Sequence, residues 1–465
     1  MPLFYISGQP ARATMSVFQE QLGLQERRAG ISLALIYAFR MLGLFLILPV
    51  FALYAEDLPE ATPLLTGLAV GIYGLTQAIL QIPFGMLSDR IGRKPVIAAG
   101  LLIFAAGSLL AASSDSIYGI IAGRALQGAG AIASALMALA ADLSREEHRV
   151  RMMALIGMSI GVAFAAAMVL GPLVNEWVGV SGIFAGTAVL AILGIGILYL
   201  FVPDPMESHF HRDAELQPSC LKSVLKTADL LRLDAGIFTL HFVLMSVFLV
   251  IPLELRDDAG LAAGQHWQIY LPMFVLSIIL MVPFIIFAER KSQMKPVFVG
   301  AIVGLIVAVL GLLSGRDLIT IATFLVLFFT AFNLLEASLP SLVSKTAHAE
   351  HKGTAMGVYS SSQFIGTFAG GALGGVAHNT WGIDGVYWLA LAMLLIWFSI
   401  AIFMNKPRNL STYLMKVSDV SEQQLLAVNG VAEAVIIKDE GVAYLKVQKD
   451  ILDEENLLSM AAKDG

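Results

Sequence analysis

Charged residues are scarce in this sequence. Asp, Glu, Lys and Arg make up 14% of its 465 residues, whereas soluble domains contain roughly a quarter. Hydrophobic residues make up 57% and the mean hydropathy is +0.79, a balance that excludes a soluble fold of this length. The single cysteine, Cys220, excludes an internal disulfide and a thiolate metal cluster, so we expect neither a metal nor another cofactor.

Two patterns of nucleotide binding and catalysis are also missing. No Gly-x-x-x-x-Gly-Lys-Ser/Thr loop occurs, so ATP is not expected to drive the protein. No nucleophile elbow lies where a strand would turn into a helix, so we do not expect an enzyme. Residues 1–29 lack the long apolar run of a secretory signal peptide, and we expect them to form a short cytosolic extension.

The hydrophobic residues that are present gather in twelve segments, each near the 20 or so residues that span a bilayer core about 30 Å thick. Six lie in residues 30–202 and six in residues 234–404, and residues 203–233 form a cytoplasmic linker. The fifth and sixth segments are expected at 152–176 and 180–202, and the eleventh and twelfth at 353–377 and 385–404. The sequence therefore predicts an all-α membrane protein of twelve transmembrane helices in two six-helix halves.

Basic residues favour one side of these segments. The gaps after the second, fourth, sixth, eighth and tenth segments hold fifteen of them, whereas the other gaps hold only Arg256 and Arg316. By the positive-inside rule, the basic side and both termini are cytoplasmic. We therefore expect a multi-pass protein of the cell inner membrane with the lipid bilayer as its surroundings.

The composition changes after Pro407, and residues 409–465 are expected to form a separate soluble domain. The expected order is strand, helix, strand, strand, helix, which is a ferredoxin-like α+β (βαββα) arrangement without its final strand. The strands are expected at Tyr413–Val417, Ala434–Lys438 and Val442–Val447, with a turn at Asp439–Gly441, and the helices are expected to open at Ser421 and Asp453.

The same tail is acidic. Residues 411–465 contain ten Asp or Glu and five Lys, which argues against nucleic acid as a partner. We expect the acidic surface to dock on the basic cytoplasmic loops and to regulate the membrane part. A folded appendage that only aids stability is the alternative.

The turn between the second and third segments reads Gly85-Met86-Leu87-Ser88-Asp89-Arg90-Ile91-Gly92-Arg93-Lys94-Pro95. It closely resembles the signature of the major facilitator superfamily, in which Gly, Asp-Arg and Gly-Arg-Lys stand at these offsets. The segment Arg124-Ala125-Leu126-Gln127-Gly128-Ala129-Gly130 is similar to the second common motif of that superfamily. The resemblance covers residues 30–404, and with the appended tail it implies a member of the putative drug and proton antiporters. Gly171-Pro172-Leu173-Val174-Asn175 is only a fragment of the antiporter motif, because two further glycines are missing.

The motif also has a physical interpretation as a conformational switch. Gly85 lets another helix approach closely, and we expect this neighbour to be the eleventh helix. Asp89 would cap the N-terminus of that helix near Gly353 and Thr354. Arg93 would pair with Asp142, so that both acids share one cation and protonation of either acid loosens the latch. The predicted switch motif consists of Gly85, Asp89, Arg90, Gly92, Arg93, Lys94 and Asp142. In the alternative interpretation, Arg90, Arg93 and Lys94 only anchor the turn to lipid phosphates.

Four ionisable residues lie inside the predicted segments, where each costs roughly 2.5–3.5 kcal/mol. They are Arg40, Arg124, His241 and Glu336. We expect Glu336 to carry a proton and His241 to assist, because histidine titrates near neutral pH. A fixed structural pair at Glu336 and a neutral histidine at His241 remain alternatives.

Further polar residues recur at helical spacing beside these charges. Tyr73 and Gln77 lie in the second segment, Tyr359 and Gln363 lie at the same spacing in the eleventh, and Asn333 precedes Glu336 in the tenth. They are expected either to line a central cavity or to form hydrogen bonds between helices.

Together these features predict a proton-coupled secondary transporter that works by alternating access and exports a small amphipathic solute. A proton symporter that imports a nutrient is the first alternative. A membrane sensor that binds a solute without transporting it, and signals through its tail, is the second.

Overall fold

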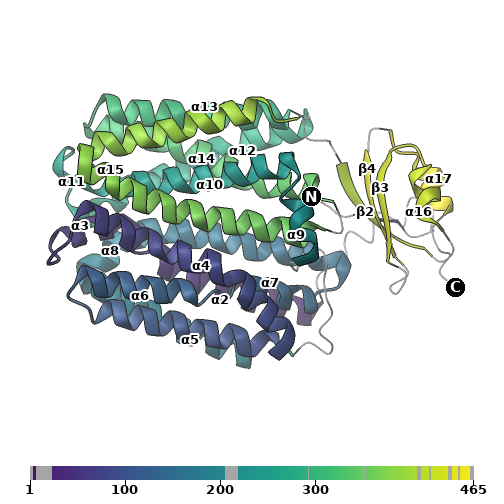
Figure 1. Ribbon diagram of the computed structural model, residues 1–465, viewed down its shortest axis with the longest axis horizontal. Coiled ribbons are helices and arrows are strands. Elements are labelled where there is room, and N and C mark those ends of the chain that lie inside the picture. The colour runs from purple at the N-terminus through teal and green to yellow at the C-terminus, as the bar shows by residue number, and fades with distance from the viewer. Residues whose placement is uncertain are drawn as a thin grey trace.

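The computed structural model describes residues 4–6, 23–204, 218–291, 293–348, 351–405, 410–417, 420–437, 442–448 and 451–460. A bundle of long, roughly parallel helices lies beside a small β-sheet (Figure 1). We call the end of the bundle that faces the sheet the sheet end. The opposite end, where α3 and α11 lie, is the far end (Figure 1).

The first half of the bundle consists of seven helical elements: α2 (Leu24–Phe45), α3 (Leu48–Glu56), α4 (Pro63–Ile91), α5 (Arg93–Ala112), α6 (Ile117–Ala129), α7 (Ala133–Asp142) and α8 (Glu146–Leu200). The second half follows a short helix α9 (Pro218–Val224): α10 (Ala228–Phe248), α11 (Ile251–Asp257), η1 (Ala263–Gln265), α12 (Trp267–Arg290), α13 (Met294–Ser314), α14 (Leu318–Thr346) and α15 (Lys352–Ile402). The expected all-helical architecture is thus present.

Local sequence signals set several of these boundaries. The Thr62 side chain accepts a hydrogen bond from the Leu65 amide and caps α4. Asp317 caps α14 by accepting hydrogen bonds from the amides of Ile319 and Thr320. Gly92 has φ of 99°, which is a low-cost conformation for glycine, and it separates α4 from α5.

Ten helices among the described residues are long and apolar enough to cross a membrane. Two of them, Arg151–Leu200 and Lys352–Ile402, have 50 and 51 residues. An unbroken helix of that length would measure about 75 Å, more than twice the thickness of a hydrocarbon core. The backbone leaves the helical conformation at Gly179 (φ 66°) and at Gly382 (φ 69°), inside the gaps that the sequence predicts between two segments.

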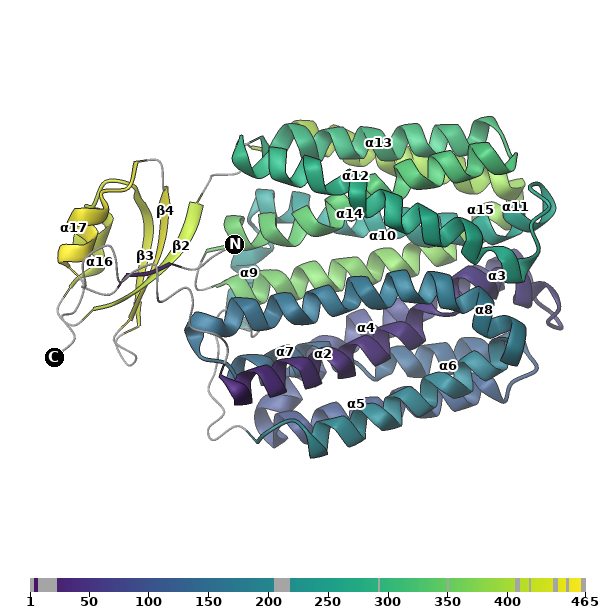
Figure 2. The same ribbon diagram turned by 180° about the vertical axis from the view of Figure 1, so that it is seen from behind.

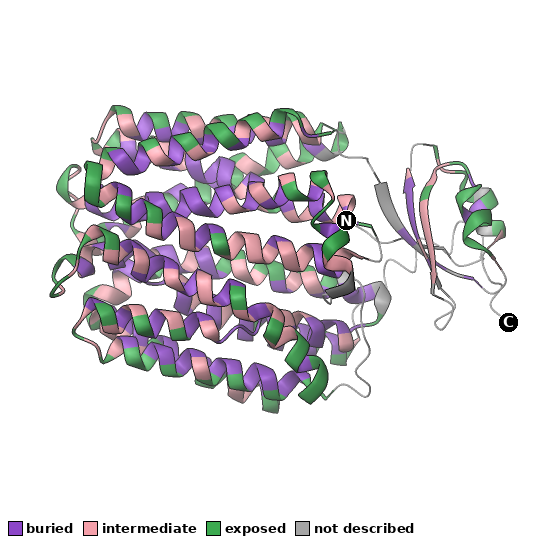
Figure 3. Ribbon diagram, in the orientation of Figure 1, coloured by how far each residue is buried: buried purple, intermediate pink, exposed green. Residues whose placement is uncertain are grey.

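Apolar side chains cover the outside of the bundle. Exposed residues follow the outer faces of the helices (Figure 3), and many of them are large and hydrophobic, such as Val162, Trp177, Phe284, Phe287 and Trp388. A soluble protein does not expose apolar surface on this scale, whereas a lipid-facing surface is built from it.

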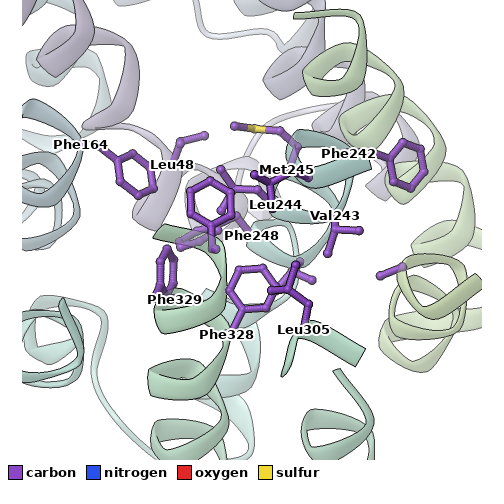
Figure 4. Close-up of a cluster of buried hydrophobic side chains, with 14 of the residues drawn as sticks. Leu48, Phe164, Phe242, Val243, Leu244, Met245, Phe248, Leu305, Phe328 and Phe329 are labelled. Carbon is purple, nitrogen blue, oxygen red and sulfur yellow. The ribbon is translucent and has the colours of Figure 1, made fainter. Parts of the chain in front are cut away.

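Aromatic side chains connect the two halves inside the bundle. Phe164 of α8 contacts Phe274 of α12 and Phe329 of α14, with ring centroids 5.6 Å and 6.2 Å apart. Figure 4 shows Phe164 facing Phe329 and Phe248 across this part of the core. These contacts bury a continuous apolar cluster between the halves.

The sheet contains four strands: β1 (Phe4–Ile6), β2 (Leu410–Lys416), β3 (Val431–Ile437) and β4 (Val442–Gln448). Their order is β1-β2-β4-β3, and α16 (Glu422–Leu426) and α17 (Glu454–Ser459) lie together on one face (Figure 2). The β2–β4 and β3–β4 pairs are antiparallel. The predicted capping box of Ser421 and Gln424 is confirmed, whereas the turn predicted at Asp439–Gly441 lies outside the described residues.

The fourth strand differs from the expectation. The sequence predicts only three strands, and it assigns residues 1–29 to a separate extension. In the structure β1 pairs with β2 in parallel, so Phe4–Ile6 adds a strand at the edge of the C-terminal sheet. Tertiary pairing of two distant segments is invisible to local periodicity, which explains the difference.

One lysine joins the sheet to the helix bundle. Lys446 of β4 is buried, and its ammonium donates hydrogen bonds to the carbonyls of Lys345, at 3.2 Å, and Ala347, beside the end of α14. Glu433 of β3 lies 3.6 Å from the same ammonium and 3.4 Å from His348 Nδ1. Burial lowers the pKa of Lys446, and Glu433 opposes this effect. At Lys446 a cation of the sheet meets carbonyl groups of the bundle, while Glu433 provides an acidic group beside His348 of the bundle.

Candidate functional site

The sequence motif around Arg93 forms a buried ion cluster at the sheet end. The Arg93 guanidinium donates hydrogen bonds to Asp142 Oδ2, at 3.2 Å, to Ser88 Oγ, at 2.9 Å, and to the Asp89 carboxylate. The side chains of Arg93 and Asp142 are 4% and 0% exposed, whereas that of Asp89 is 40% exposed. Arg93 therefore holds both acids, and its pairing with Asp142 is the one that the sequence predicts.

The neighbours of the motif differ from the expected ones. A Cβ atom on Gly85 would lie 3.1 Å from Cβ of Ser134, so Gly85 packs against α7 and not against the eleventh helix. The sequence predicts that Asp89 caps the start of α15, but in this conformation Asp89 binds Arg93. Both corrections have the same reason: α4 and α15 approach each other most closely near Gly71 and Gly371, toward the far end.

The remaining two cations of the motif have different surroundings. Lys94 donates a hydrogen bond to the Val202 carbonyl and pairs with Asp204, both at 2.7 Å, which ties the start of α5 to the end of α8. Arg90 is exposed. An anchor that meets lipid phosphates thus fits Arg90, but not the buried Arg93 and Lys94.

Two arginines form the polar centre of the first half. Arg40 is 1% exposed and donates hydrogen bonds to Gln77 Oε1, at 2.6 Å, and to the Gly130 carbonyl, at 3.0 Å. Arg124 is equally buried and donates to Gln127 Oε1 at 3.0 Å and to the carbonyls of Ala69 and Val70. The ring of Tyr73 lies beside both guanidinium groups, 5.8 Å from Arg40 and 5.3 Å from Arg124. The acceptors of these arginines are neutral oxygens.

An acid and a histidine form the polar centre of the second half. His241 Nδ1 of α10 lies 3.9 Å from Glu336 Oε2 of α14. The amide nitrogen of Gln363, on α15, lies 2.8 Å from His241 Nε2 and 3.5 Å from Glu336 Oε1. Because an amide N–H donates, His241 Nε2 accepts from Gln363 and a neutral ring carries its proton on Nδ1, which lies beyond hydrogen-bond distance of Glu336 Oε2. The Glu336 side chain is 38% exposed although its helix lies inside the bundle.

The remaining predicted cavity residues, Tyr359 and Asn333, have different surroundings. Tyr359 lies on the same face of α15 as Gln363, four residues away, and is 5% exposed. Asn333 donates a hydrogen bond to Ser277 Oγ of α12 at 3.2 Å. It therefore links α14 to α12, and it is not brought into the group of Glu336, His241 and Gln363.

Two buried carboxylates were missed by sequence reasoning. Asp234 of α10 is 6% exposed and Glu254 of α11 is 1% exposed. The sequence begins the seventh segment at residue 234, so Asp234 is taken for the edge of a helix that in fact begins at Ala228. Glu254 accepts a hydrogen bond from the Tyr387 hydroxyl, and its Oε1 lies 3.8 Å from Arg316 Nε.

The two halves meet most closely toward the far end. A Cβ atom on Gly371 of α15 would lie 2.6 Å from the carbonyl oxygen of Gly67 in α4. Arg256 of α11 pairs with Glu56 of α3 at 2.6 Å. Nearer the sheet end, α4 and α15 are joined by a side-chain hydrogen bond from Gln81 to Ser361, also 2.6 Å long. The helices α4 and α15 therefore touch through their backbones toward the far end and through side chains nearer the sheet end.

These features define a multi-pass membrane transporter, and comparison with known proteins identifies its family. The chain belongs to the Major Facilitator Superfamily, whose sequence pattern matches residues 33–371. Members of this family are transporters and not enzymes.

A close relative is the inner membrane transport protein YajR of Escherichia coli strain K12. It is 44% identical over 433 residues, which cover 92% of this chain and 95% of the relative. The multidrug resistance protein MdtH of Yersinia enterocolitica is 26% identical over 344 residues, covering 72% of this chain and 82% of its own.

Solved structures share the fold at low sequence identity. A bacterial homologue of the human lysosomal transporter Spinster, in an inward-facing and occupied conformation, has a TM-score of 0.69 at 13% identity and covers 83% of this chain and 98% of its own. The human organic anion transporter MFSD10 has a TM-score of 0.61 at 20% identity, with 82% and 100% covered.

Proposed function

We propose that this protein is a proton-coupled secondary transporter that exports small amphipathic solutes or drugs by alternating access. The observation that carries the proposal is the group of Glu336, His241 and Gln363 at the centre of the second half. A carboxylate that is partly exposed inside a helix bundle, and that faces an imidazole N–H, can take up and release a proton. Export of drugs is favoured by the relative MdtH, which is a multidrug resistance protein.

The proposal includes a topology of twelve membrane crossings. Each of the two long helices contains enough residues for two crossings, and each breaks at a glycine with positive φ. Dividing them at Gly179 and Gly382 turns ten candidate spans into twelve. The excess of basic residues in the gaps at the sheet end supports a cytoplasmic location of that end, in the inner membrane.

Alternating access requires contacts that break at one end while others form at the opposite end. At the far end, the close backbone contact of Gly67 with Gly371 and the ion pair of Arg256 with Glu56 join the halves. At the sheet end, the exposed carboxylate of Asp89 shares Arg93 with Asp142. We propose that Asp89 exchanges Arg93 for the N-terminus of α15 when the sheet end closes. The switch then consists of one cation and two acids.

The C-terminal domain is proposed to have a ferredoxin-like fold and to regulate the transporter. Its strand and helix order is that of a βαββα unit, to which β1 adds the fourth strand. The Lys446 ammonium binds carbonyls beside the end of α14, the helix that also carries Glu336. A cation at a helix C-terminus is favoured by the helix dipole. The docked domain therefore contacts the same helix, α14, that carries the proposed proton site.

Transport measurements in proteoliposomes test the function. Amphipathic fluorescent dyes that stabilise the purified protein in a thermal-shift screen are loaded, and their flux is followed under pH gradients of either sign. A proton-coupled exporter moves dye against the direction of proton flow and drives it uphill. Dye flux that is the same under both pH gradients as without a gradient would contradict the proposal. Movement of dye in the direction of proton flow would indicate symport.

Hydrogen exchange tests the docked domain. Lys446→Gln removes the ammonium that binds the end of α14, so the amides of residues 345–348 should exchange faster than in the unmodified protein. Lys291→Gln, an exposed lysine at the end of α12, serves as the control. Equal protection of residues 345–348 in all three proteins would contradict docking through Lys446.

A further inference from the structure

Four buried polar atoms in one part of the second half have no hydrogen-bond partner among the described residues. They are Asp234 Oδ2 and His241 Nδ1 of α10, Glu336 Oε2 of α14 and the Tyr359 hydroxyl of α15. Buried polar groups are rarely left unpaired, and unpaired ones cluster where a protein binds something or moves a proton. His241 and Glu336 already belong to the proposed proton site, whereas Asp234 has no role in it.

These groups lie at increasing depth from the sheet end. Counting 1.5 Å per residue from the helix ends gives about 9 Å for Asp234, about 10 Å for Tyr359, about 15 Å for Glu336 and about 20 Å for His241. The helices α10 and α15 pack closely near this level, where a Cβ atom on Gly366 would overlap the carbonyl oxygen of Phe238. One turn above Tyr359, Gln363 lies 3.5 Å from Glu336 Oε1. Tyr359 therefore lies between the levels of Asp234 and Glu336, on a helix that packs against α10 and contacts Glu336.

The surroundings of Asp234 make the ionised form of its carboxyl group costly. Asp234 is 6% exposed and has no salt bridge to any described cation. On its own helix, Arg232 is bound to Asp229 at 2.7 Å. The helix α15 contributes Tyr359 and α14 contributes Glu336, neither of which is a cation. The lysines of these helices, Lys345 and Lys352, lie in the terminal turns at the sheet end. On α4, Asp89 is bound to Arg93, and Arg90 is exposed. A buried carboxylate in these surroundings is much less costly as a neutral acid, since removing an isolated charge from water has a large free-energy penalty.

We propose that Asp234 is a second proton-binding site of the transporter, coupled to Glu336 through Tyr359. This inference rests on the proposed proton coupling and extends it from one carboxylate to two. Glu336 lies beside His241 and Gln363, whereas Asp234 Oδ2 has no hydrogen-bond partner among the described residues, so we assign the retained proton to Asp234 and the exchanged proton to Glu336. In each binding step a proton from solution forms an O–H bond with a carboxylate oxygen, and release reverses that step. Because the two anions would repel each other, the protonation of one favours release from the other.

Infrared difference spectroscopy of the purified full-length protein tests the proposal without a solute. Protonated buried carboxyl groups give C=O stretching bands that disappear when the acid ionises or is replaced. Asp234→Asn should remove one such band, and Asp234→Glu should restore a band at a shifted frequency. Asp229→Asn is the matched control, because this residue lies on the same helix but is paired with Arg232 near the surface. A spectrum of Asp234→Asn with every wild-type carboxyl band would overturn the second site.

The coupling is tested in the same spectra. Glu336→Gln should remove its own band and shift the pH midpoint of the Asp234 band, and Tyr359→Phe should shrink that shift. An Asp234 midpoint that stays the same after Glu336→Gln would overturn the coupling. Failure of the second site is distinguishable from failure of the proposed function. If only the second site fails, Asp234→Asn leaves the carboxyl bands unchanged while Glu336→Gln alters them. If the proposed function fails, dye flux does not depend on the pH gradient.

Discussion

Away from the last helical turn at the sheet end, where Arg93 pairs with Asp142 and His148 with Glu26, the two halves of the bundle bury opposite charges. The first half encloses Arg40 and Arg124, whose acceptors are amide and carbonyl oxygens. The second half encloses Asp234, Glu254 and Glu336. A guanidinium remains charged at any physiological pH, whereas a carboxylate can bind a proton. At this depth the first half therefore contains fixed cations, whereas the second half contains groups that can bind a proton.

The largest expected effect concerns the scaffold. Arg124→Met removes three hydrogen bonds from a charged donor, although the carbonyls of Ala69 and Val70 keep their helical donors within α4. A hydrogen bond to a charged group contributes about 1.5–3 kcal/mol, so stability should fall by about 3 kcal/mol or more. Thermal unfolding in detergent measures the loss, with exposed Arg27→Met as the control. Unchanged stability combined with lost transport would instead make Arg124 a functional cation and break the comparison.

A second prediction concerns the contact between the halves. In Gly371→Val the new Cβ would lie 2.6 Å from the Gly67 carbonyl oxygen, too close for the helices to keep their distance. The far end should then fail to close, and dye transport should be lost. Gly300→Val is the matched control, because no atom lies within 4 Å of a Cβ at Gly300. Distances between spin labels on α3 and α11 measure the opening, and wild-type distances in Gly371→Val would contradict the prediction.

A smaller effect is expected at the histidine. His241→Asn removes the ring nitrogen that accepts from Gln363, at a cost of about 1 kcal/mol, which corresponds to about a fivefold change in rate. Because Glu336 remains, transport should be slower but should still follow the pH gradient. Dye flux at several gradients tests this. If coupling disappears as completely as in a variant of Glu336, the histidine is itself the proton carrier.

The smallest effect is expected at the ion pair of the far end. Arg256 and Glu56 are 37% and 46% exposed, and exposed ion pairs contribute about 0–1 kcal/mol. Arg256→Gln should therefore change transport rates less than Gly371→Val. A double-mutant cycle with Glu56→Gln isolates the pair. A coupling energy well above 1 kcal/mol would show that the charge pair, and not the glycine contact, controls closure.

The sequence predicts the helical architecture and the shared Arg93 because these depend on local patterns. Hydrophobic length identifies the spans, and the spacing of the motif brings Asp89 and Arg93 one helical turn apart. Long-range packing is not encoded in such patterns. Gly85 therefore has a different neighbour, Phe4–Ile6 becomes a strand of a distant sheet, and Lys446 finds its acceptors on another domain. Asp234 escaped prediction because the true start of α10 lies six residues before it.

The central claim is that the coupling proton binds in the second half, at Glu336. It is tested most directly by measuring solute exchange and solute accumulation by Glu336→Gln side by side in proteoliposomes. Glu336→Gln keeps the shape of the side chain and removes its charge, while Glu60→Gln, on an exposed loop, is the control. The account predicts that Glu336→Gln still exchanges labelled for unlabelled dye but no longer accumulates it when a pH gradient is imposed. Accumulation at the wild-type level in Glu336→Gln would contradict the account.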